Sequence, residues 1–368
     1  MAKIKKMNVL MVVSGITFFM STSLGQSTQY QPDKRGKFII ENQLNKCPEV
    51  NENAITIKLT SIVEWVRLNN QVMNPPIGFD AAISFSGNLC NEVRRNEAFG
   101  RQSKIYYSLR YYYIENGVSK TTTDWAAHGT EILINNPTRF ISTQFDETGV
   151  QTNDPPHLKQ PLKMALENLK RYYAISPIIK EIAPGVRLYA PKPGTWFSGT
   201  IIVFNPNQPD IWIPVTVKEI MEARLAYYNI KQEIDSINYE KTKAQWAKMN
   251  FKPAAGKSMQ PMLYDVIKNE YEKFTVEELN SPAFLSSDEQ FGVSMVNTRG
   301  VGRLVVRFNP ACWDRSLPVT AIQFISMEYR PATALELEEF KQRNGGLTDY
   351  VGLFFNNMPV EKMGELIK

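Results

Sequence analysis

The chain has 368 residues, of which 43% are hydrophobic and 21% are charged, and its formal net charge is +5. This is the composition of an ordinary globular protein. The first 25 residues carry three lysines and no acidic residue, so the remainder has a net charge of +2, which argues against a nucleic-acid partner.

The N-terminus has the pattern of a secretory signal peptide. Lys3, Lys5 and Lys6 precede an apolar stretch at 7–20, and small residues follow at 23 and 25. This pattern predicts a signal peptide over 1–25 with cleavage before Gln26. We therefore expect export to the periplasm or the extracellular space. No later stretch is long and apolar enough to span a membrane, so the mature chain is not expected to do so.

Residues 36–150 predict an N-terminal domain with one helix and an antiparallel sheet. Apolar residues at 55, 59, 62, 63 and 66 favour an amphipathic helix over 54–73. The alternating run 105–114 predicts a strand, and Asn116-Gly117 after it predicts a two-residue hairpin turn. Short strands are expected at 83–85 and 131–135.

A thirteen-position pattern then occurs twice. The second copy begins at Phe308, 104 positions after Phe204 (308 − 204). Seven positions are identical and an eighth exchanges Ile for Leu, which predicts an internal duplication. The identical residues are Phe204, Asn205, Pro206, Asp210, Pro214, Val215 and Thr216 in the first copy, and Phe308, Asn309, Pro310, Asp314, Pro318, Val319 and Thr320 in the second.

The regions around the two copies predict two related modules, 158–250 and 258–343, followed by a C-terminal tail over 344–368. A helix is expected to open at Gln160-Pro161 in one module and at Gln260-Pro261 in the other, because proline suits the first helical turn. Strands are expected at 186–189, 200–204, 292–296 and 303–308, the last of each module ending at the Asn-Pro turn. The fold class is therefore α+β, an N-terminal domain followed by two duplicated modules.

Each motif copy ends in residues typical of a helix start. Thr216 with Glu219, and Thr320 with Gln323, have the spacing of a capping box. A long helix or two shorter ones should follow Thr216. After Thr320 the alternation of residues 325, 327 and 329 also allows a strand.

Cysteine and histidine limit the chemistry. Cys47 and Cys90 are the favoured disulfide pair, although a pair between Cys90 and Cys312 stays open. The only histidines are His128 and His157, which nearly excludes a multi-histidine zinc site, and no cofactor motif is present. We expect neither metal nor cofactor.

Two groups of residues are candidate sites. Asp210 and Asp314 are the alternative for a catalytic pair, since duplicated halves can each supply one carboxylate, although both also suit turns. Aromatic rings in or near the repeat loops and on the hairpin can bind sugars or peptides if they are exposed. These rings are Trp196, Trp212, Trp313, Tyr106 and Tyr112.

Taken together, these patterns favour a non-enzymatic binding or envelope-structural protein, with a protein or glycan of the cell envelope as its partner. The alternative is a secreted hydrolase of glycans or peptides that uses Asp210 and Asp314. Without an activated nucleophile or a metal set in the sequence, the first interpretation is preferred.

Overall fold

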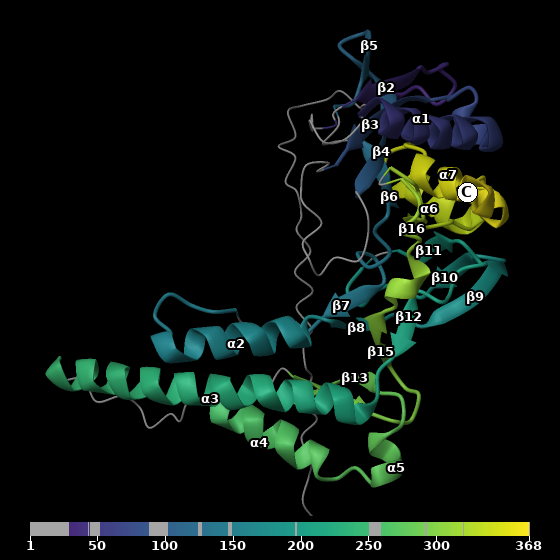
Figure 1. Ribbon diagram of the computed structural model, residues 1–368. Helices are drawn as coiled ribbons and strands as arrows, with labels where there is room; N and C mark the ends of the chain where they lie inside the picture. The colour runs from purple at the N-terminus through teal and green to yellow at the C-terminus, as the bar shows by residue number, and fades with distance from the viewer. Residues whose placement is uncertain are drawn as a thin grey trace, which may run out of the picture.

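The computed structural model (Figure 1) describes most of the chain downstream of the predicted signal peptide. The described residues are 29–42, 44, 52–87, 102–123, 127–145, 149–195, 197–249, 259–290, 293–318 and 320–367. The predicted leader, Cys47, Cys90 and Trp196 lie outside these ranges. The fold class is α+β, as predicted.

The larger sheet has ten strands, whose main path runs β2-β3-β4-β6-β16-β11-β10-β9, while β1 and β5 pair with β4. Its pairs are antiparallel except for β2 with β3, which run parallel. The strands are β1 (Gln29–Tyr30), β2 (Phe38–Asn42), β3 (Phe79–Ser86), β4 (Ser103–Glu115), β5 (Val118–Thr121), β6 (His128–Ile134), β9 (Ile178–Ala183), β10 (Val186–Tyr189), β11 (Gly199–Phe204) and β16 (Phe324–Tyr329).

The smaller sheet has six strands in the order β14-β13-β15-β8-β7, with β12 paired to β15. Its strands are β7 (Ser142–Gln144), β8 (Tyr172–Ile175), β12 (Trp212–Pro214), β13 (Phe284–Gln290), β14 (Val293–Asn297) and β15 (Arg303–Phe308). The helices are α1 (Glu52–Asn69), α2 (Pro156–Leu169), α3 (Val217–Lys248), α4 (Met259–Tyr271), α5 (Val276–Leu279), α6 (Ala334–Arg343) and α7 (Tyr350–Asn356), with single 3₁₀ segments η1 (Gln71–Met73), η2 (Pro310–Cys312) and η3 (Val360–Leu366).

Three hydrophobic cores order the elements into layers. The first joins α1, α7 and η3 to one face of the larger sheet, and the second joins α2, α3 and α4 to the smaller sheet. The third lies between the two sheets. Strand β11 shows the alternation that this requires, because Ile201 and Val203 belong to the first core while Ile202 and Phe204 belong to the third. In Figure 1, α2, α3 and α4 lie together at one end of the molecule, and α1 lies near the C-terminal helices at the other.

Several local predictions are confirmed. The predicted helix 54–73 is α1 followed by the 3₁₀ turn η1, and its inward face is buried. The hairpin turn at Asn116-Gly117 joins β4 to β5, and both residues have positive φ, 53° and 74°. These angles are those of a type I′ turn, for which this dipeptide is the favoured sequence.

The helix predicted to open at Gln160-Pro161 begins earlier. Pro155 is the N-cap of α2 and Pro156 is in its first turn, so Pro161 lies inside the helix. The chain offers two proline-based starts five residues apart, and the earlier one is used. In α4, Pro261 falls in the first turn of the described helix, Met259–Tyr271, and residues 250–258 before it lie outside the described ranges.

The predicted modules share their sheets. Strand β16 of the second module lies between β11 of the first and β6 of the N-terminal region. Strand pairing also differs: β10 and β11 pair directly, whereas β14 and β15 both pair with β13. The order helix, strands and Asn-Pro turn recurs, but common ancestry of the two modules stays a prediction. The predicted tail forms α7 and η3 and packs into the first core.

The second predicted capping box is wrong. Thr216 caps α3, since its hydroxyl accepts a hydrogen bond from the Glu219 N–H at 3.2 Å. Thr320 begins no helix, and strand β16 follows it at Phe324. The Gln323 side chain instead bonds to both main-chain groups of Asp314, at 2.8 Å each. The strand that the alternating residues also allowed is the one observed.

Candidate functional site

In the first motif loop, the Asp210 carboxylate is bound by an arginine from another strand. Nη1 of Arg187, on β10, donates to both carboxylate oxygens at 3.0 and 2.9 Å, and the Arg187 Nε bonds to Glu181 at 3.1 Å. Burial alone would lower the pKa of Arg187, but the charge of Asp210 and the hydrogen bonds to the two carboxylates raise it. The guanidinium also lies over the Phe204 ring, 4.5 Å from its centroid. Asp210 is thus half of an ion pair.

The second loop holds Asp314 locally. Its Oδ1 accepts hydrogen bonds from the N–H and the hydroxyl of Ser316, at 2.9 and 2.6 Å. These two bonds lower the pKa of Asp314, because they favour the ionised form. The loops meet through the Asn309 amide, which donates to the main-chain oxygen of Asp210 at 2.8 Å. A shared proton needs a raised pKa, so these contacts give the catalytic-pair hypothesis no support.

The four candidate aromatic residues within the described ranges are less exposed than a binding face requires. Trp212 and Tyr112 are buried, with 7% and 6% of their surface exposed, so neither meets the condition of exposure on which a binding role depended. Trp212 packs against Tyr173 and Phe308 in the core between the sheets, and the Tyr112 hydroxyl donates to Asp80. Trp313 and Tyr106 are half-buried, and Trp313 stacks on Phe324. These rings mainly fill the interior.

A pair of glutamates stands on the central strands of the larger sheet. Ile132 of β6 pairs with Met327 of β16, and Glu131 and Glu328 occupy the next position along these two antiparallel strands. Burial and the charge of Glu131 raise the pKa of Glu328 to about 7. Glu131, however, already forms salt bridges with Lys104 at 3.0 Å and with Arg139 at 2.8 Å. A carboxylate with two cationic partners is also the arrangement of a structural ion-pair cluster, so the pair alone does not define an active site.

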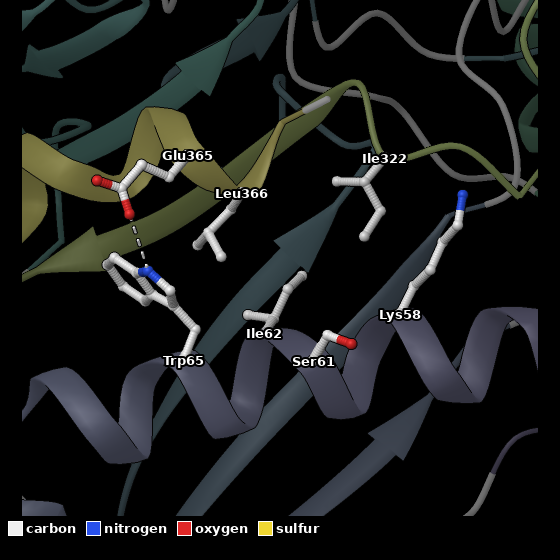
Figure 2. A pocket seen from close by; sticks show the side chains of 7 residues that line it. All are labelled: Lys58, Ser61, Ile62, Trp65, Ile322, Glu365 and Leu366. Carbon is white, nitrogen blue, oxygen red and sulfur yellow. Dashed lines mark hydrogen bonds between the residues drawn. The ribbon is translucent and has the colours of Figure 1, made fainter.

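A pocket of about 360 Å³ lies between α1 and the C-terminal segment (Figure 2). Its apolar lining is Ile62 and Trp65 from α1, Ile322 from the segment before β16, and Leu366 at the end of η3. The polar lining is Lys58, Ser61 and Glu365. A hollow of this size with a mostly apolar surface and few polar groups has the character of a small-molecule site.

The local sequence explains how α1 supplies one wall. Ile55, Leu59, Ile62 and Val66 lie on its inward face and are at most 4% exposed. Lys58, Ser61 and Trp65 follow at the helical spacings of three and four residues, so they share the adjacent face. The Trp65 Nε1 donates to Glu365 at 3.4 Å, which links the helix to the C-terminal segment.

Sequence reasoning missed this site. The helix was predicted, and its face with Lys58 and Trp65 was readable from periodicity. Residues 344–368 were interpreted as a tail, so Glu365 and Leu366 were not considered. Their position depends on η3 packing beside β9, β10 and β11 in the first core, and those contacts join residues far apart in the sequence.

Comparison with protein-family models, with curated proteins and with solved structures gave no match to the chain. Across the described ranges, no three His, Cys, Asp or Glu side chains are grouped to hold a metal ion. No helix of those ranges is both long and apolar enough to cross a membrane. Cys312 is buried and has a free thiol, whose pKa burial raises to about 12. The predicted pairing of Cys47 with Cys90 lies outside the described residues.

Proposed function

We propose that this chain is an exported, non-enzymatic binding protein whose ligand site is the pocket between α1 and the C-terminal segment. The observation that carries the proposal is the pocket of about 360 Å³ with Ile62, Trp65, Ile322 and Leu366 as its apolar surface. Small-molecule sites of about 300 to 1,000 Å³ have this mixture of apolar walls and a few polar groups.

The polar groups of the pocket favour binding over catalysis. The Ser61 hydroxyl donates to the main-chain oxygen of Ile57 at 2.9 Å, so its proton is directed at a carbonyl group rather than at a base. Glu365 accepts from the Trp65 indole. A nucleophile needs an adjacent base that is itself oriented, and these contacts supply neither.

Export is the second part of the proposal and rests on the leader pattern with Lys3, Lys5 and Lys6. It is tested by expressing the full chain in a Gram-negative host and measuring the intact mass of the product. A mass corresponding to a start at Gln26, in the periplasmic fraction or the medium, supports export. A full-length product that stays in the cytoplasm contradicts it.

The pocket is tested by filling it from its rim. Ser61 is exposed and lines the hollow, so Ser61→Phe should occupy the space while leaving the core intact. Ser236 on α3 is a matched control, because it is also an exposed helical serine that bonds to the carbonyl four residues earlier, at 2.7 Å. The two variants make the same substitution in the same local setting.

The probes are hexanol, hexanoate, hexylammonium and the tripeptide Leu-Ala-Leu, each titrated by calorimetry. At least one probe should bind the unsubstituted protein and Ser236→Phe, and should fail to bind Ser61→Phe. The tryptophan fluorescence of the protein should change on binding and should not change in Trp65→Phe. Binding that Ser61→Phe leaves unaltered, or no binding of any probe, rejects the pocket as the ligand site.

A further inference from the structure

Opposite charges stand at the two ends of the pocket. Lys58 lies at one end and Glu365 at the other, and the apolar side chains lie between them (Figure 2). Among the described residues, Lys58 has no carboxylate within ion-pair distance. Glu365 accepts one long hydrogen bond, from Trp65 at 3.4 Å, so its oxygens retain the capacity to accept more.

The helix sets the separation of these two ends. Lys58 and Trp65, which bonds to Glu365, are seven positions apart on α1 (65 − 58). At about 1.5 Å of rise per residue, their Cα atoms are roughly 10 Å apart along the helix axis. Three extended residues span about 10 Å. The helical wall from Lys58 to Trp65 is therefore about as long as a tripeptide.

The surface between the ends suits apolar side chains. Ile62 is buried, with 2% of its surface exposed, and Ile322 and Leu366 are half-buried around it. An apolar side chain of a ligand placed here would remove hydrocarbon of both the ligand and the pocket from water, which favours binding. A ligand with one charge would satisfy only Lys58 or only Glu365, so the pocket favours a molecule that carries both charges.

From this arrangement, and resting on the binding role proposed above, we infer that the ligand is a short apolar peptide with free termini. Its C-terminal carboxylate lies at Lys58 and its N-terminal ammonium lies at Glu365. Its side chains cover Ile62, Ile322 and Leu366.

The test blocks the two peptide termini separately and removes the two protein charges separately. The ligands are Leu-Ala-Leu, its N-acetyl form, its C-terminal amide and the doubly blocked form, titrated by calorimetry into the mature protein. The variants are Lys58→Gln, Lys58→Arg and Glu365→Gln. Lys163→Gln is the control, since Lys163 is exposed on α2 in a different layer and loses the same charge.

The free peptide should bind the unsubstituted protein. Each blocking group should raise the dissociation constant of the peptide about fivefold, which is the effect of losing a solvent-exposed ion pair. Lys58→Gln should abolish the effect of amidation and preserve that of acetylation, and Glu365→Gln should do the reverse. Lys58→Arg should restore sensitivity to amidation. Lys163→Gln should behave like the unsubstituted protein.

The outcomes separate this inference from the proposed function. If all four peptides bind equally, or if the variants leave the sensitivity to blocking unaltered, the peptide assignment is wrong. The same holds if hexanol or hexanoate binds in a manner that Ser61→Phe prevents and the free peptide does not bind. In those cases the binding role of the pocket remains if Ser61→Phe prevents the binding that is observed. Binding that Ser61→Phe leaves unaltered, or the failure of every probe, removes both proposals.

Discussion

The two motif loops contain the same residues and place them in different surroundings. Their first turns are alike: the Asn205 side chain accepts from the N–H of Asn207 at 3.0 Å, and that of Asn309 accepts from the N–H of Ala311 at 3.1 Å. Each aspartate accepts a hydrogen bond from the N–H two residues on, Asp210 from Trp212 at 3.4 Å and Asp314 from Ser316 at 2.9 Å. The two differ in their other bonds, because Asp210 pairs with Arg187 from β10 while Asp314 accepts from the Ser316 hydroxyl in its own loop. The motif thus determines the bonds whose partners lie two residues away, and the fold determines the others.

The structures that follow the two motifs also differ, since a helix follows the first and a strand follows the second. Helix α3 follows Thr216 with Lys, Glu, Met, Ala and Arg among its first residues, and these are strong helix formers. After Thr320, the segment from Phe324 to Tyr329 contains Phe, Ile and Tyr, which favour strands, and its apolar residues 325, 327 and 329 alternate with polar ones, which suits a strand rather than a helix. The common threonine is compatible with either path, so the residues after it decide the structure.

The largest effect should come from the contact that only the first loop has. Arg187→Met should destabilise the protein by about 2 kcal/mol, because it leaves two carboxylates without their partner and removes the contact with Phe204. This value is below that of a fully buried pair, since the Asp210 side chain is 50% exposed. The measurement is the free energy of unfolding in urea.

Arg343→Met is the control for that prediction. Arg343 pairs with Glu339 at 3.5 Å on exposed α6, where 72% of the arginine side chain is exposed, so its loss should cost less than about 0.5 kcal/mol. Equal losses for Arg187→Met and Arg343→Met would show that the first loop does not depend on β10.

The second-largest effect concerns the asparagines. Asn309→Ala should cost about 1.5 kcal/mol and Asn205→Ala about 0.7 kcal/mol, because Asn309 has a second bond, from its amide to the main chain of Asp210. Urea unfolding of both variants measures the difference. If Asn205→Ala lost more stability than Asn309→Ala, Asn309 could not be assigned as the link between the loops.

The sequence predicts those elements that depend on contacts between residues close together in the chain, and it does not predict those that depend on contacts between distant residues. The hairpin at Asn116-Gly117, helix α1 and strands β10 and β15 were predicted because short-range periodicity and turn chemistry define them. The sharing of one sheet by β6, β16 and β11 was not predicted, since strand order depends on pairs as far apart as Ile134 and Ile325. The repeat made two separate modules the simpler prediction.

The same limit applies to the candidate sites. Asp210 and the aromatic residues were chosen for their residue types, and Arg187 and the burial of Trp212 appear only in the tertiary structure. The pocket residues Lys58 and Glu365 lie 307 positions apart (365 − 58), so no local pattern relates them.

The third-largest effect on stability should come from the two threonines of the motif copies. Thr216→Ala should cost about 1 kcal/mol, because its hydroxyl satisfies the free N–H of Glu219 at the start of α3. Thr320→Ala should change stability by less than about 0.5 kcal/mol, since no helix starts there. Thermal unfolding of both variants gives the comparison. A similar loss in both would mean that Thr320 makes an equivalent contact.

The smallest effect concerns the aspartates and depends on pH. Asp314 has a lowered pKa through its bonds to Ser316, so its carboxylate stabilises the folded state above the unfolded pKa, near 4, and that stability is lost as the pH falls through the lower folded pKa. Asp314→Asn should therefore lower the melting temperature slightly at pH 6, and the difference from the unsubstituted protein should shrink as the pH falls below about 4.

Asp210→Asn supplies the comparison, because it removes a charge that faces Arg187 and should cost more than Asp314→Asn at pH 6, up to about 0.5 kcal/mol. Both losses are small because an amide oxygen still accepts a hydrogen bond. If the two aspartates shared a proton, either substitution would alter the titration of the other. Separate acid transitions in the two single variants, with additive losses in the double variant, would exclude that coupling. An acid transition of one aspartate that shifts when the other is substituted would instead restore the catalytic-pair hypothesis for the two motif loops.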